Sequence, residues 1–187
     1  MIRRIVTFII PTLIQALILT KKRKKKIIES IRIKAKEKLH QKCITHPFSL
    51  IIDYGIGSKF TVIGKYNGIN YSTKNIRIHL FSHFIGWTKK STNELLITTI
   101  HEYCHAIHDI AEFDSELAFR IAELSTQPEF LFDDDDWDEF FCDKFAHYIL
   151  NLSRFSPPTQ NMCEGMVRRF NKVIYSLTNV DYFNRIG

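Results

Sequence analysis

The sequence has few of the residues and patterns that mark several common protein classes. Its 187 residues include 7 Gly, 5 Pro and 4 Cys, and they contain no internal repeat. So little Gly and Pro excludes collagen-like and low-complexity chains. No two cysteines form a CxxC pair, which excludes a thioredoxin-like motif and a zinc ribbon. With 45% hydrophobic and 13% aromatic residues, the chain can bury a core, so a wholly disordered protein is also excluded.

The positive charge of the chain is concentrated at one end. Residues 1–42 contain 13 Lys and Arg and 2 acidic residues, whereas residues 43–187 contain 13 basic and 18 acidic residues. We therefore predict a basic N-terminal segment, residues 1–42, and a mildly acidic domain, residues 43–187. Two of the four cysteines lie in apolar stretches, which favours free thiols in a reducing compartment and hence a cytoplasmic protein.

The N-terminal segment begins with an apolar run at residues 5–20, followed by the basic cluster Lys21–Lys26. The run is shorter than the roughly 20 residues that span a bilayer. Three interpretations remain open: a short membrane anchor, a helix that binds an anionic membrane surface through residues 1–30, or a core helix followed by a solvated basic face. Basic clusters also attract nucleic acid, but no Phe, Trp or Tyr lies between residues 9 and 47 to stack on bases. We therefore do not expect a nucleic-acid partner.

Turn residues and apolar patterns predict strands followed by helices. Three stretches rich in β-branched and aromatic residues predict strands at 48–54, 59–66 and 75–84. Asn67-Gly68 is a hairpin-turn signal, and the alternation in the last stretch is typical of a half-buried strand at a sheet edge. Helical patterns follow at 91–125, with a break at Phe113–Ser115, and at 137–152 and 160–177. We expect an α+β fold, with a small antiparallel or mixed sheet packed on the first of these helices and further C-terminal helices.

The strongest motif is His101-Glu102-Tyr103-Cys104-His105, an HExxH sequence inside the helix predicted at 91–125. Residues i and i+4 share one face of a helix, so both imidazoles can bind one metal ion. Glu102 points into the same cleft and can take a proton from metal-activated water. The sequence therefore predicts Zn²⁺ ligands at His101 and His105, with Glu102 as the catalytic base.

A third ligand is expected from the next predicted helix. Glu139 and Asp143 are i and i+4 on that helix, so they also share a face. We expect Glu139 to complete the zinc site and Asp143 to accept a hydrogen bond from the outer nitrogen of a ligating imidazole. His147 is an alternative third ligand. His108, seven residues after His101, lies about 10 Å further along the helix axis and is expected to line the cleft.

Together the two motifs resemble those of zincin metallopeptidases of the gluzincin type, in which HExxH is followed by ExxxD. The second motif is most similar to that of ImmA/IrrE-like metallo-endopeptidases, a helix of the form E-x-x-A-(N/D)-x-F-A, which Glu139, Asp143, Phe145 and Ala146 match. Cys142 stands where that family has Ala. The resemblance covers roughly residues 60–152. It implies a minimal zincin fold with an antiparallel sheet on the active-site helix, a Zn²⁺ cofactor and cleavage of a protein or peptide substrate.

We therefore predict a zinc-dependent metallo-endopeptidase, a hydrolase that attacks peptide bonds with metal-activated water. The last predicted strand could bind an extended substrate as an added strand. His147 and Tyr148 are candidate transition-state stabilisers, with His79 and His83 as alternatives. Two other classes remain open: a SprT-like zincin that uses His108 or His147 as third ligand, and a non-catalytic metal-binding or membrane-associated interaction protein.

Overall fold

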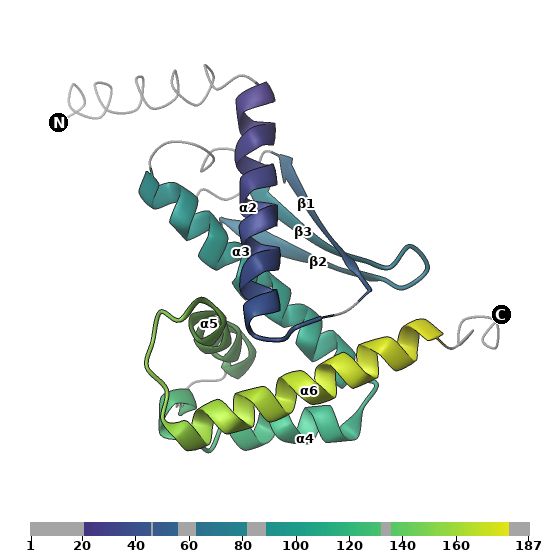
Figure 1. The fold of residues 1–187 in the computed structure, drawn as a ribbon, viewed down its shortest axis with the longest axis vertical. Helices are drawn as coiled ribbons and strands as arrows, with labels where there is room; N and C mark the ends of the chain where they lie inside the picture. The colour runs from purple at the N-terminus through teal and green to yellow at the C-terminus, as the bar shows by residue number, and fades with distance from the viewer. Residues whose placement is uncertain (1–20, 46, 56–62, 82–88, 132–135, 180–187) are drawn as a thin grey trace.

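The computed structural model describes residues 21–45, 47–55, 63–81, 89–131 and 136–179 (Figure 1). Its elements are α2 (Lys21–Gln41), β1 (Ser49–Gly55), β2 (Gly64–Asn70), β3 (Asn75–Phe81), α3 (Lys89–Ala111), α4 (Ser115–Leu124), the short 3₁₀ helix η2 (Pro128–Phe130), α5 (Trp137–Leu150) and α6 (Pro157–Asn179). Within these residues the fold is α+β, with a small mixed sheet, and this confirms the predicted class.

The strand order of the sheet is β1-β3-β2, with β1 parallel to β3 and β2 antiparallel to it. β3 is therefore the central strand of the described sheet, and the prediction that it lies at an edge is wrong. Ile76, Ile78 and Leu80 are fully buried and alternate with less buried neighbours. Such alternation reports that one face of a strand is covered, but it carries no information about the strands beside it.

The predicted hairpin turn at Asn67-Gly68 is also wrong. Both residues lie inside β2, where a shift of register between Tyr66 and Ile69 marks a β-bulge. Gly68 has a φ of +85°, a backbone conformation that glycine adopts in a bulge as readily as in a turn. The turn into β3 comes at residues 71–74 instead. The ends of two predicted strands, 59–62 and 82–84, lie outside the described residues.

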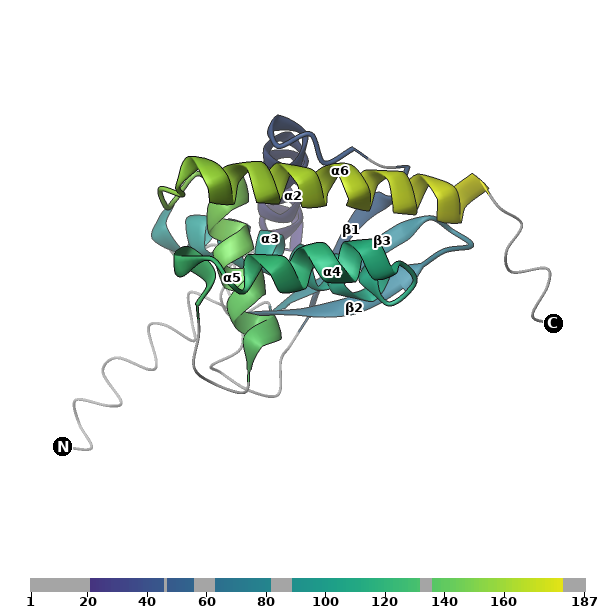
Figure 2. The ribbon, with the colours of Figure 1, turned by 90° about the horizontal axis from the view of Figure 1, so that it is seen from below.

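The helix predicted at 91–125 divides where the sequence indicates. α3 ends at Ala111 and α4 begins at Ser115. The side chain of Asp114 caps α4 by accepting a hydrogen bond from the backbone N–H of Leu117 at 2.8 Å. The same carboxylate pairs with Arg169 of α6, and Figure 2 shows α6 running alongside α4.

Helix α2 exposes Arg23, Lys25 and Lys26 on its outside and carries an apolar stripe on its inside. Ile28, Ile31, Ala35 and Leu39 are buried in the same core as residues of α3 and the sheet, a spacing typical of an amphipathic helix. α2 contacts α3, β1 and α5. Residues 21–41 therefore share the core of the rest of the chain, while the division at residue 42 stays a prediction.

Two further expectations concern the membrane and the cysteines. No helix within the described part of the chain combines the length and the apolar character needed to cross a bilayer. The apolar run at residues 5–20 lies outside the described residues, so its contact with a membrane stays a prediction. The four cysteines are free, as predicted; Cys43 is exposed and the other three are buried.

Candidate metal centre

Helices α3 and α5 pack together and bring two imidazoles and one carboxylate to a single point. His101 and His105 lie one turn apart on α3, so both rings project from the same face. Glu139, in the first turn of α5, reaches both rings. Its Oε2 lies 3.0 Å from Nε2 of His101, and its Oε1 lies 3.3 Å from Nε2 of His105.

These three side chains fit a small divalent cation. One ligand atom from each lies within 4.8 Å of the other two. Zinc–ligand bonds of about 2.0–2.2 Å place tetrahedral ligand atoms about 3.3 Å apart. One oxygen of Glu139 lies 3.0 Å from the His101 ring and the other lies 3.3 Å from the His105 ring, and both distances are close to that length. The donor set of two imidazoles and one carboxylate leaves a fourth tetrahedral position, which is the arrangement of catalytic rather than structural zinc.

The outer nitrogen of each imidazole also has a partner on α5. Nδ1 of His101 lies 2.8 Å from Oδ1 of Asp143, where a proton on Nδ1 would leave Nε2 free to bind a metal. Nδ1 of His105 lies 3.5 Å from the sulfur of the buried Cys142. A single helix therefore supplies the carboxylate between the rings and the groups that orient both rings.

Glu102 lies beside these groups and is held by the sheet. Its Oε2 accepts a hydrogen bond of 2.6 Å from the backbone N–H of Tyr66 in β2. Burial raises the pKa of the Glu102 carboxyl, while the two nearby imidazoles and the Tyr66 N–H act in the opposite direction. A carboxylate whose proton affinity is raised in this way is suited to accept a proton and pass it on.

The sequence interpretation missed Tyr66, which contacts the site in two further ways. Its ring stacks on that of His105, with centroids 6.2 Å apart. Its hydroxyl donates a hydrogen bond of 2.5 Å to Asp109, one turn beyond His105 on α3. Burial, followed by the Asp109 carboxylate, raises the pKa of the hydroxyl, which therefore stays protonated. No local motif announces this residue, because its place depends on the bulge that follows it in β2.

β2 comes close enough to α3 for these contacts because Gly64 has no side chain. A Cβ atom at Gly64 would lie 2.6 Å from Cγ2 of Thr98 and 3.4 Å from Cγ of Glu102. Any larger residue would separate the strand from the helix.

The candidate transition-state stabilisers are engaged elsewhere. Nδ1 of His147 lies 3.1 Å from the Ser153 hydroxyl, beyond the C-terminal end of α5. Tyr148 is buried, and the Lys42 ammonium lies 4.0 Å from its ring centre. Both follow Glu139 by at least eight residues, about 12 Å along the helix axis. Their contacts give no support for a role at the metal.

His79 and His83, the alternative stabilisers on the third predicted strand, are not placed at the candidate metal centre by the described residues either. Successive side chains of a strand point to opposite faces, and Leu80 lies on the face that meets α3, so His79 lies on the other face. His83 lies outside the described residues. Neither residue therefore gains support from the structure as a stabiliser at the metal.

His108 lies next to the centre rather than in it. Its Nδ1 is 3.5 Å from Oδ1 of Asp138, the residue before Glu139, and its ring packs edge-on against Phe141 at 4.8 Å between centroids. Burial lowers the pKa of His108, and the Asp138 carboxylate opposes this shift. These contacts agree with the predicted cleft-lining role and do not favour His108 as the third ligand of a SprT-like site.

Comparison of the chain with known protein families, with curated proteins and with solved structures finds no significant match in any of the three.

Proposed function

We propose that the chain is a zinc-dependent metallo-endopeptidase that hydrolyses peptide bonds of a protein or peptide substrate. One observation carries the proposal: one ring nitrogen each of His101 and His105 and one carboxylate oxygen of Glu139 lie within 4.8 Å of one another. Glu102 lies on α3 next to His101. Two ligand imidazoles flanking a non-ligand carboxylate match what metal-assisted hydrolysis requires.

Each residue has a distinct role in this proposal. His101, His105 and Glu139 hold the metal, which when bound supplies Lewis-acid polarisation of the scissile carbonyl and acidifies water. Glu102 takes the proton of the attacking water and delivers it to the leaving amine. The Tyr66 N–H orients the Glu102 carboxylate, and Asp143 orients the ring of His101.

The packing of α3 against β2 and β3 supports the finer prediction of a minimal zincin fold. The strand pairing also makes β2, rather than β3, the strand that could bind an extended substrate. β3 is paired on both sides, whereas β2 pairs only with β3 among the described residues. The Tyr66 N–H points from β2 toward Glu102. An extended substrate added along the open side of β2 would therefore pass the catalytic carboxylate.

The test combines metal analysis with a cleavage assay on the full chain. We expect near-stoichiometric zinc in the purified protein and its loss in His101→Ala. Glu102→Gln should keep the zinc and lose cleavage of a denatured protein substrate such as casein. Glu123→Gln is the matched control, because Glu123 is an exposed residue of α4 and should retain both properties.

The outcomes separate the competing classes. Zinc that is bound but supports no cleavage in any preparation would favour the non-catalytic metal-binding protein. Absence of zinc and of cleavage would show that the HExxH sequence is accidental. Cleavage that survives Glu102→Gln in a chelator-treated, zinc-reloaded sample would contradict the role of Glu102.

A further inference from the structure

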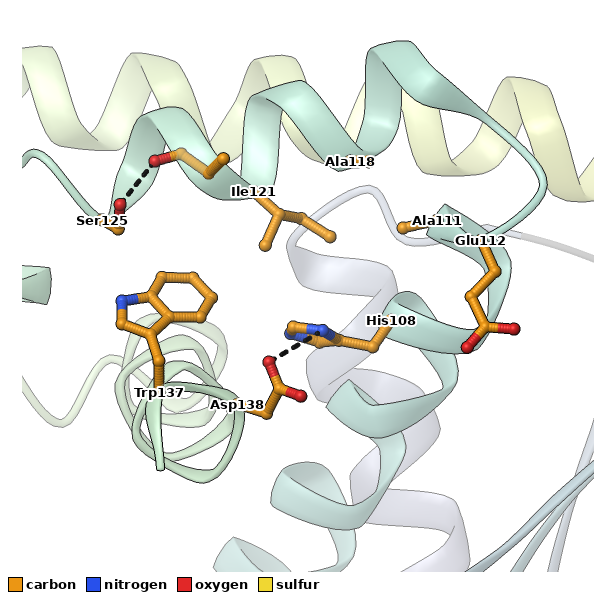
Figure 3. A pocket seen from close by; sticks show the side chains of 9 residues that line it. His108, Ala111, Glu112, Ala118, Ile121, Ser125, Trp137 and Asp138 are labelled. Atoms are coloured by element: carbon orange, nitrogen blue, oxygen red, sulfur yellow. Dashed lines mark hydrogen bonds and ion pairs between the residues drawn. The ribbon is translucent and has the colours of Figure 1, made fainter. Parts of the chain in front are cut away.

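A cavity of about 410 Å³ lies beside the candidate metal centre, between the end of α3, α4 and the start of α5. One wall is formed by Ala118, Ile121 and Ala122 of α4, and the other by His108 and Trp137 (Figure 3). Figure 3 shows the two rings on one side and α4, with Ile121, on the other. The cavity is therefore a slot with methyl groups on one side and ring systems on the other.

The rings on one side of the slot form an aromatic cluster against which a further ring can pack. Trp137 stacks on Phe141 with centroids 5.2 Å apart, and His108 lies 6.1 Å from Trp137. Aromatic rings favour neighbours at such separations, in stacked or edge-on geometry. The facing residues Ala118 and Ala122 are exposed although they are apolar, so a flat apolar guest would cover them. A cavity of roughly 150 Å³ can already hold a benzene ring.

The slot has few polar atoms on its ring wall. Nε2 of His108 and Nε1 of Trp137 are buried and have no hydrogen-bond partner among the described residues. The carboxylate of Asp138 lies at the edge of the slot and contacts His108. Glu112 and Ser125 also line the slot, but apolar surface dominates the lining, so the slot selects mainly by shape and apolar character.

The slot lies next to the candidate metal centre along both α3 and α5. His108 follows the ligand His105 by three residues, about 4.5 Å along the axis of α3, and Asp138 precedes the ligand Glu139. An extended peptide advances about 3.3–3.6 Å per residue. A side chain one to three residues from the scissile bond can therefore enter the slot while that bond lies at the metal.

We propose that this slot binds an aromatic side chain of the peptide substrate, one to three residues from the bond that is cleaved. The proposal rests on the peptidase function for its role, but the binding of an aromatic group does not require the metal. The slot would give the enzyme a preference for Phe, Tyr or Trp at one position beside the cleavage site.

The first measurement uses metal-free protein labelled with ¹⁵N in the indole nitrogens. The chain has 2 Trp, so Trp137→Phe assigns the Trp137 signal. N-acetyl-phenylalanine amide should shift this signal in a saturable way, and N-acetyl-alanine amide should not. Ala118→Leu fills the slot from an exposed position and should abolish the shift. Glu123→Leu, an exposed residue of α4 outside the lining, should leave it unchanged.

The second measurement is cleavage of a random peptide library by the zinc-loaded protein, read by mass spectrometry. We expect about tenfold enrichment of aromatic residues at one position near the cut, a typical discrimination for an apolar pocket. Ala118→Leu should lose that preference, whereas Glu123→Leu should keep it. Cleavage without aromatic preference, together with no probe shift, would overturn the slot while leaving the peptidase function intact. Probe shifts without any cleavage would overturn the peptidase function but would support the slot as an aromatic-binding site.

Discussion

Replacing Asp143 by Ala should weaken zinc binding about tenfold, because the orienting partner of a ligating imidazole typically contributes 10–100-fold to metal affinity. Oδ1 of Asp143 lies 2.8 Å from Nδ1 of His101, a length typical of a charge-assisted hydrogen bond. The carboxylate is 67% exposed, so water competes for it and the effect should fall at the low end of the range. A tenfold loss corresponds to about 1.4 kcal/mol.

The expected loss has two parts that a matched variant separates. Removing any carboxylate near a divalent cation weakens binding through charge alone. Asp138→Ala removes the same charge from the same helix, but Asp138 faces His108 rather than a ligand imidazole. Since Asp138 is 72% exposed, the screened charge effect should be less than about threefold. Asp143→Asn keeps an oxygen acceptor without the charge and should lie between wild type and Asp143→Ala.

Zinc affinity is measured by competition with a chromophoric chelator at one pH and salt concentration. Circular dichroism of each metal-free variant checks that the fold is kept. Equal losses for Asp143→Ala and Asp138→Ala would refute the argument, because they would show a charge effect without orientation of His101. An unchanged affinity in Asp143→Ala would show that the hydrogen bond does not act on the metal at all.

Four further predictions test the structure of the chain, one for each of four substitutions. Gly68→Ala should lower the free energy of unfolding by about 1 kcal/mol. The loss comes from the positive φ alone, since nothing lies within 4 Å of the added Cβ. Gly64→Ala should lower the free energy of unfolding by about 2 kcal/mol, because its Cβ would lie 2.6 Å from a methyl carbon on α3. Equal urea midpoints for the Gly68 and Gly64 variants would contradict the close approach of β2 to α3. Hydrogen bonding to Arg169 lowers the pKa of Asp114, so this carboxylate stabilises the fold above its unfolded pKa of about 3.9 and loses the effect as pH falls through its lower folded pKa. Asp114→Asn should therefore flatten the unfolding free energy below about pH 4, and unchanged acid sensitivity would contradict the pairing. Cys142→Ala removes the sulfur that lies 3.5 Å from the His105 ring. It should lower zinc affinity by less than about threefold, because sulfur is a weak hydrogen-bond acceptor. A larger loss in the same chelator competition would show that the sulfur orients the ring more strongly.

The part of the site that could be predicted from sequence is the part that one helix determines by itself. The spacing of His101 and His105, and of Glu139 and Asp143, places each pair on one face whatever the rest of the chain does. The structure then brings the two pairs together, with Glu139 between the imidazoles. The break before α4 was equally local, because Asp114 caps that helix from the position just before its first residue.

The missed features depend on contacts between distant segments. Tyr66 reaches Glu102, thirty-six residues away, only because β2 continues through a bulge at Gly68 rather than turning there. An Asn-Gly pair suits both a turn and a bulge, so its local preference does not decide between them. The central place of β3 is likewise set by the parallel pairing with β1, which leaves no mark on the apolar alternation of either strand.

Helix α5 joins the candidate metal centre to the core, because its two faces have different roles. Phe141, Cys142, Phe145 and Ala146 are fully buried, while Glu139 and Asp143 are more than half exposed on the side facing α3. The small side chain of Ala146 allows α5 to lie close to its neighbours, and the packed rings prevent it from sliding. Functional geometry must be held to about 0.5 Å, so the buried face sets the position of Glu139 relative to the imidazoles. Changes to the buried face should therefore disturb metal affinity and stability together, whereas changes to the exposed carboxylates should disturb metal affinity alone.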